Sequence, residues 1–251
     1  MAKERMSKNH RVGLIVPSSN TTMETEIPAV LARQNGDDTF TFHSSRMRMN
    51  EVTQAALIAM DVESDRCAIE LSDARCDVLA YACLVAIMAQ GSGYHRLSQD
   101  RLAAAAEANG GAAPVVSSAG ALIDALNHLG ARRTAIITPY MRPLTELVAG
   151  YIAGSGIEVG DRISLEVSDN LAVGRLDPAG LVAHARRLDL TRVDAVVLSA
   201  CVQMPSLSAV QAVEDELGLP VVSAATATAR SILLALGMTP SVPDAGRLLA
   251  G

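Results

Sequence analysis

The sequence predicts an α/β fold made of two pseudo-symmetric halves, each a four-stranded parallel sheet flanked by helices. Short apolar runs rich in β-branched residues alternate with helical stretches along the chain, which is typical of parallel strands joined by crossover helices. Most of these runs are continuous rather than alternating, as expected for strands covered on both faces. Three strand motifs also recur, in the same order, later in the chain.

The apolar runs predict eight strands. In chain order they are Val12–Val16, Phe40–His43, Val78–Tyr81, Pro114–Val116, Thr134–Thr138, Ile163–Val167, Ala195–Leu198 and Pro220–Val222. Helical periodicity between them is clearest in three stretches, Thr53–Ala74, Leu181–Leu188 and Leu207–Leu217.

The repeat indicates that the two halves share one plan. Arg11–Pro17 resembles Arg133–Pro139, Asp77–Cys83 resembles Asp194–Cys201, and Val115–Ala121 resembles Val221–Ala227. One such match would be chance among apolar strands, whereas three in order favour a repeated unit over two generic α/β units. We therefore expect a first half at residues 1–120, completed by the C-terminal helix at about 225–251, and a second half at 121–224.

Composition excludes several classes of partner. The 251 residues carry 27 acidic and 21 basic side chains, a net charge of −6, with no basic tract and no Trp, so we expect no nucleic-acid partner. The longest apolar run, Val78–Ala89, is shorter than the about 20 residues that a bilayer requires, so we expect no membrane partner. A charged N-terminus and four cysteines without a C-x-x-C pair favour a cytoplasmic protein.

Polar and reactive side chains follow several predicted strands. Ligands of parallel sheets bind beyond the carboxyl ends of the strands, and there the chain carries Asn20, Cys83, Tyr140, Asn170 and Cys201. Two thiols stand at matching places in the two halves. If the halves face each other, the thiols meet across one cleft.

Each candidate also has a purely structural interpretation. A lone cysteine at a strand end is most often a small buried hydrophobe, but the matching positions of Cys83 and Cys201 favour a shared function. We expect Cys67, on the apolar stripe of its helix, and Cys76, at a helix–strand junction, to be structural. Asn20 could serve only as a helix cap.

Four further polar side chains are weighed against a structural role. Tyr140 could be a half-buried residue at the rim of the site. Arg46 and Arg48 could grip a carboxylate, although solvated charges at a strand end explain them more simply. Asn170 precedes no clear helix, so a capping role is less expected there.

Motifs for other chemistries are absent from the sequence. The cysteines and His95 lack zinc-ligand spacing, and neither a phosphate-binding glycine loop nor a G-x-S-x-G nucleophile motif occurs. We therefore expect neither a metal nor a cofactor.

Six motifs together resemble the maleate cis–trans isomerase family of the aspartate/glutamate racemase superfamily. They are Val16–Glu24, Phe42–Arg48, Tyr81–Val85, Pro139–Tyr140, Asp169–Ala172 and Ser199–Gln203. The resemblance covers nearly the whole chain. It implies two α/β halves with a cofactor-free active site in the cleft between them, a homodimer, and a place in nicotinate degradation.

The resemblance also implies roles for particular residues. Cys83 would be the nucleophile and Cys201 the proton donor. The two carboxylates of a small dicarboxylate substrate, maleate, would be held by side chains and backbone at Asn20, Leu84, Val85, Tyr140, Asn170 and Val202. The implied reaction is isomerisation of maleate to fumarate through a covalent succinyl-cysteine, and it needs Cys83 as thiolate and Cys201 as thiol.

Other functions stay open at this point. A two-cysteine amino-acid or hydantoin racemase would use the same thiols as acid and base. The apolar residues after the cysteines, Leu84 and Val202, count against a substrate whose ammonium needs polar partners. Arylmalonate decarboxylases usually keep one of the two cysteines, so the pair counts against that activity. A binding protein with a decayed site is disfavoured by the intact thiols and amides.

Overall fold

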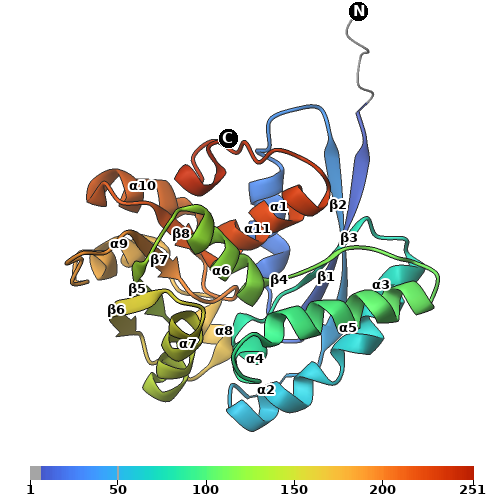
Figure 1. Cartoon of the computed structure of the whole chain (residues 1–251), viewed down its shortest axis with the longest axis horizontal. Helices are drawn as coiled ribbons and strands as arrows, with labels where there is room; N and C mark the ends of the chain where they lie inside the picture. The colour runs from blue at the N-terminus through green and yellow to red at the C-terminus, as the bar shows by residue number, and fades with distance from the viewer. Residues whose placement is uncertain (1–6, 50) are drawn as a thin grey trace, which may run out of the picture.

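The computed structural model describes residues 7–49 and 51–251, and it contains two four-stranded parallel sheets with the same strand order. The first sheet has the order β2-β1-β3-β4, with β1 Asn9–Pro17, β2 Thr39–Met47, β3 Val78–Tyr81 and β4 Val115–Ser117. The second has the order β6-β5-β7-β8, with β5 Arg133–Thr138, β6 Glu158–Ser164, β7 Ala195–Ser199 and β8 Val221–Ser223. Figure 1 shows the first sheet on the right and the second on the left. The predicted fold class is confirmed.

Helices flank both sheets. Those before β5 are α1 Met23–Leu31, α2 Gln54–Asp61, α3 Ser64–Asp73, α4 Leu84–Met88, α5 Tyr94–Ala108 and α6 Ser118–His128. Those after β5 are α7 Arg142–Gly154, α8 Asn170–Val173, α9 Ala179–Ala185, α10 Leu207–Leu217 and α11 Ala224–Ala235, followed by a short 3₁₀ turn at Arg247–Leu249. Within the described residues, none of the helices is long and apolar enough to cross a membrane.

Two sequence predictions of element limits were wrong. The strand expected at Ile163–Val167 is β6, which begins at Glu158 and ends at Ser164. It is an edge strand paired with β5 alone, so its outer side tolerates the charged residues that hid it from an apolar search. The helix expected over Thr53–Ala74 is divided after Asp61, whose carbonyl accepts from the Ser64 hydroxyl at 2.6 Å instead of continuing the helical ladder.

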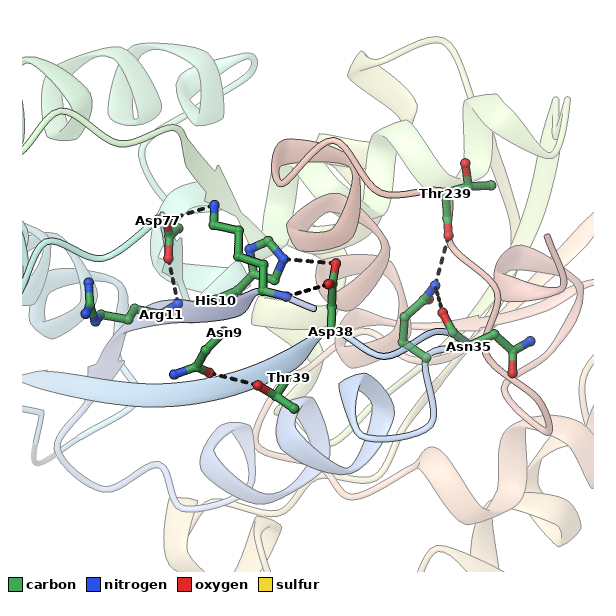
Figure 2. Close-up of polar contacts among 10 residues, drawn as sticks. Asn9, His10, Arg11, Asn35, Asp38, Thr39, Asp77 and Thr239 are labelled. Atoms are coloured by element: carbon green, nitrogen blue, oxygen red, sulfur yellow. Dashed lines mark hydrogen bonds and ion pairs between the residues drawn. The ribbon is translucent and has the colours of Figure 1, made fainter. Parts of the chain in front are cut away.

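A hydrogen-bonded aspartate explains why one repeated motif begins as it does. The Asp77 carboxylate accepts the N–H of Arg11 at 2.8 Å, and the Arg11 carbonyl accepts the N–H of Asp77 at 2.8 Å (Figure 2). In the second half, Asp194 forms the same reciprocal pair with Arg133, at 2.9 and 2.8 Å. Each aspartate therefore closes the open end of the ladder between its strand and the neighbouring one.

The start of the first sheet is further tied by polar side chains. His10, buried on β1, lies 3.3 Å from the Asp38 carboxylate (Figure 2). Its ring also stacks on Phe40. Thr39 donates to the side chain of Asn9 at 3.2 Å. These contacts set the register of β1 and β2 at the edge opposite the strand ends that carry the candidate residues.

Several contacts join segments that are far apart in the chain. Helix α11 packs against α6, α1 and β4, and Figure 1 shows it returning toward α1. On α1, the buried Glu26 carboxylate accepts the N–H groups of Ser206 and Leu207 at 2.6 and 2.7 Å, at the N-terminus of α10. Burial raises the pKa of Glu26, and these bonds oppose the shift. The limits 1–120 and 121–224 themselves stay a prediction.

Candidate active site

One cavity at the carboxyl ends of the strands collects every residue that the sequence proposed for the site. The predicted residues on its wall are Asn20, Cys83, Leu84, Val85, Tyr140, Asn170, Cys201 and Val202. The remaining wall is formed by Pro17, Met49, Val52, Leu57, Ala82 and Gln203. None of these described lining residues is Lys, Arg or His, so any anion held here meets neutral donors.

The cavity is narrow. Its volume is about 20 Å³, of the order of what one water molecule needs, so no dicarboxylate fits between walls in this position. Met49, Val52 and Leu57, from the segment between β2 and α2, form an apolar part of the wall. The walls must therefore move apart to admit a substrate.

Cys83 lies where β3 ends and α4 begins. Its thiol is 6% exposed and accepts the backbone N–H of Ala86 from the first turn of α4. Burial raises the pKa of Cys83 to about 12, because the single backbone bond compensates little of the lost hydration. Burial thus disfavours the thiolate that the implied role of Cys83 requires, and the thiolate state of Cys83 stays a prediction.

Cys201, 5% exposed, lies just beyond β7 and has more hydrogen-bond donors around its sulfur. The Tyr140 hydroxyl and the backbone N–H groups of Gln203 and Met204 all hydrogen-bond to it. Burial raises the pKa of Cys201, and the three donors oppose the shift. These donors reduce the cost of the thiolate that remains when Cys201 gives up its proton.

The two asparagines use part of their hydrogen-bonding capacity within the protein. The side-chain oxygen of Asn20 accepts the N–H of Met23 at 3.0 Å, so the capping interpretation is correct for that atom. The amide nitrogen of Asn170 donates to the Ser19 hydroxyl at 2.8 Å. An amide nitrogen carries two N–H bonds, so both residues can still donate to a carboxylate in the cavity that they line.

The four other predicted contact residues offer different groups to the cavity. Leu84 and Val85 form the first turn of α4, where backbone N–H groups have no acceptor within the helix. Val202 lines the cavity from the loop after β7. The Tyr140 hydroxyl is hydrogen-bonded to the sulfur of Cys201. Because the hydroxyl has one proton, it can donate either to that sulfur or to a substrate oxygen, but not to both at once.

Arg46 supports the site from outside the cavity. Its guanidinium donates to the carbonyls of Ser18 and Asn20 at 3.0 and 3.1 Å and pairs with Glu24. It therefore shapes the loop that carries Asn20, while its side chain, 38% exposed, stays at the surface as the sequence favoured. Arg48 is exposed beyond the end of β2 and does not line the cavity.

The other two cysteines lie in the core. Cys67 on α3 is 0% exposed and Cys76 before β3 is 5% exposed, and neither lines the cavity. Burial raises the pKa of both thiols. Their positions agree with structural roles.

Sequence reasoning missed a buried carboxylate near the site. Asp61, 2% exposed, accepts the hydroxyls of Tyr81 and Tyr94, each at 2.7 Å, and pairs with Arg101 at 3.1 Å. Its charge adds to burial in raising the pKa of Cys83. A lone Asp on a predicted helix gives no sequence signal of such a role. In the described part of the chain, no cluster of His, Cys, Asp and Glu could hold a metal ion.

Comparison with known proteins gives close relatives over the full length. A family model described as arylmalonate decarboxylase matches residues 12–249. A maleate isomerase from Geobacillus stearothermophilus is 64% identical over 249 residues, covering 98% of this chain and 99% of that protein.

Solved structures agree in the whole fold. The maleate isomerase of Pseudomonas putida S16, in a cysteine-to-alanine variant with maleate, has a TM-score of 0.95 and 56% identity over 97% of this chain and 98% of its own. The maleate cis–trans isomerase of Nocardia farcinica, in a cysteine-to-serine variant with a covalently bound succinylcysteine intermediate, has a TM-score of 0.94 and 49% identity over 96% of this chain and 98% of its own.

Proposed function

This chain belongs to the arylmalonate decarboxylase family and, within it, to the maleate isomerases, and on that premise we propose that it converts maleate to fumarate without a cofactor. The observation that carries the proposal is the pair of thiols, one from each half, on a single apolar cavity with neutral polar groups. In such a cavity a cysteine thiol can add to a double bond and leave again, while hydrogen-bond donors of the wall hold two carboxylates.

The proposed reaction uses one thiolate and one thiol. The Cys83 thiolate donates its electron pair to one alkene carbon, and the Cys201 thiol gives its proton to the other, leaving Cys201 as thiolate. The carbon–carbon bond is now single, so one carboxylate end turns. Cys201 then removes a proton, the double bond re-forms as trans, and the Cys83 thiolate leaves. The relative from Nocardia farcinica supports this path, since a variant of it holds a succinylcysteine.

Neutral anchors suit a substrate that must turn. Asn20, Asn170 and the first N–H groups of α4 can hold carboxylates by hydrogen bonds, without the charge attraction that Arg or Lys would add. The racemase alternative fits less well, because Leu84 and Val202 offer no polar side chain to an ammonium group.

A turnover assay without added cofactor tests the proposal. We expect fumarate from maleate, and no racemisation of L-aspartate and no decarboxylation of an arylmalonate, under the same conditions. Conversion of L-aspartate to its enantiomer, with maleate unchanged, would establish the racemase alternative. If the folded protein turns over none of the three substrates, that result would favour the hypothesis of a binding protein with a decayed site.

The pH dependence of kcat/KM follows from the raised pKa values. Burial raises the pKa of both active-site thiols, so the free enzyme at pH 7 is mostly in its dithiol form, and the monoanion increases with pH. Because kcat/KM reports ionisations of the free enzyme, it should rise about tenfold per pH unit between pH 7 and 9. Initial rates at low maleate concentration measure this slope. A plateau that begins below pH 8 would contradict it.

Three finer expectations stay predictions: a homodimer, a cytoplasmic location and a place in nicotinate degradation. The first and third rest on the family resemblance, and the second rests on the charged N-terminus and the cysteine content. Sedimentation of the purified protein would test the first of them directly.

A further inference from the structure

The side chain of Gln203 has all four of its hydrogen-bonding positions occupied by backbone groups. It is buried, with 3% exposure, at the cavity wall. Its oxygen accepts the N–H groups of Thr21 and Thr22 at 3.1 and 3.4 Å. Its nitrogen donates to the carbonyls of Ser19 and Asn170 at 3.1 and 3.0 Å. A primary amide offers two acceptor and two donor positions, so this one is saturated.

The four partners belong to the loops that carry the two candidate anchor amides. Three of them surround Asn20 in the chain, and the fourth is the backbone of Asn170 itself. The backbone N–H of Gln203 also points to the sulfur of Cys201 at 3.4 Å. One residue therefore joins a loop of the first half, a loop of the second half and the candidate proton donor.

A glycine makes room for this amide. A Cβ atom at Gly174 would lie 2.6 Å from the side-chain nitrogen of Gln203, which is closer than such atoms approach. The φ of Gly174 is −67°, a value that any residue adopts, so the backbone itself does not require glycine here. The space is needed for the Gln203 side chain.

We propose that Gln203 is a positioning residue, whose side chain fixes the distance between the Asn20 and Asn170 loops and their placement relative to Cys201. This inference rests on the proposed function. A dicarboxylate that spans both loops depends on that distance, because each carboxylate must meet its own donors at the same time. The reaction of Cys83 with a small neutral electrophile, whose double bond the sulfur attacks, does not depend on it.

The test compares these two kinds of reaction in Gln203→Met and Gln203→Glu. For maleate, kcat/KM should fall about hundredfold in both variants, the usual effect of displacing substrate-holding groups by about 1 Å. For N-ethylmaleimide, the rate of labelling of the Cys83 peptide, followed by mass spectrometry, should stay within about threefold of the parent protein.

The Glu variant adds a pH readout. Its carboxylate keeps the acceptors for Thr21 and Thr22 but faces the carbonyls of Ser19 and Asn170 without a proton to donate. Protonation at lower pH restores one donor. Its kcat/KM, divided by that of the parent protein at the same pH, should therefore increase as the pH falls from 8 to 6.

Matched controls exist for both kinds of change. Gln211 on α10 accepts the N–H of Gly246 at 3.2 Å and does not line the cavity, so Gln211→Met should leave the maleate kinetics unchanged. Gly174→Ala displaces the amide of Gln203 and should lower kcat/KM, whereas Gly180→Ala on α9 meets open space and should not.

Two results would overturn the proposal. One is a kcat/KM for maleate within about threefold of the parent protein in the folded Gln203 variants. The other is an equal loss of maleate turnover and maleimide labelling, which would mean general deformation of the cavity. If Gln203→Met does not fold, the maleate kinetics and maleimide labelling of Gln203→Glu and Gly174→Ala test the proposal by the same two criteria. Failure of the parent protein itself to isomerise maleate would instead refute the proposed function.

Discussion

Replacement of Cys83 by Ala is expected to lower maleate isomerisation by about 10⁴-fold or more, the scale seen when an enzyme loses its nucleophile. Without the sulfur no bond forms to the alkene carbon, and the double bond keeps its barrier to rotation. The fold should persist, because Cys83 is a small side chain at the end of β3 and its removal leaves the sheet intact. Fumarate formation and the far-ultraviolet circular dichroism of the variant measure the two effects.

Cys67→Ala is the matched control for that variant. It also removes a buried thiol, but from a helix outside the cavity, so it should cost about 1 kcal/mol of unfolding free energy and little turnover. Cys76→Ala should behave in the same way. Retained isomerisation in Cys83→Ala would end the proposed mechanism. A loss of more than about hundredfold in kcat for a folded Cys67→Ala or Cys76→Ala would reveal a third catalytic thiol.

Replacement of Cys201 by Ser is expected to stop turnover while maleate still binds. Serine keeps the shape of the side chain, but its hydroxyl is a far weaker acid than a thiol, so it neither delivers the proton nor takes one back at a useful rate. Any adduct that forms with a proton from solvent should accumulate on Cys83, because its breakdown needs a base at position 201. Maleate affinity by calorimetry and turnover by ultraviolet absorbance separate the two effects.

Heavy water gives an independent test of the same step. If the Cys201 thiol exchanges with solvent while the adduct exists, some deuterium should appear at the vinylic carbons of fumarate made by the parent protein. Normal turnover in Cys201→Ser, with no deuterium in the product of the parent protein, would exclude Cys201 as the acid. Tyr140, whose hydroxyl is hydrogen-bonded to the Cys201 sulfur, would be the next candidate for the acid.

The strand ends were predictable from the sequence because apolar runs and parallel-sheet geometry depend on local patterns. Asp77–Cys83 and Asp194–Cys201 matched in the sequence, and each ends a central strand, β3 or β7, at the same cavity. The charged edge strand β6 was misplaced by the same reasoning, since an edge strand needs no continuous apolar run.

Properties that depend on tertiary contacts could not be predicted. The raised pKa of Cys83 depends on its burial and on the nearby Cys201 and Asp61, which only the fold brings close to it. The role of Arg46 arises because β2 pairs with β1 and brings the guanidinium beside the loop after β1. Gln203 stood within a motif that the sequence had singled out, but its four partners come from two separate loops.

The most direct test of the account is to locate the succinyl adduct. The parent protein and the Cys201→Ser variant are mixed with maleate, quenched in acid, digested and analysed by peptide mass spectrometry. The account predicts a mass increase equal to one maleic acid on the peptide that contains Cys83, and none on the peptide that contains Cys201. An adduct on the Cys201 peptide of the parent protein would reverse the roles assigned to the two thiols.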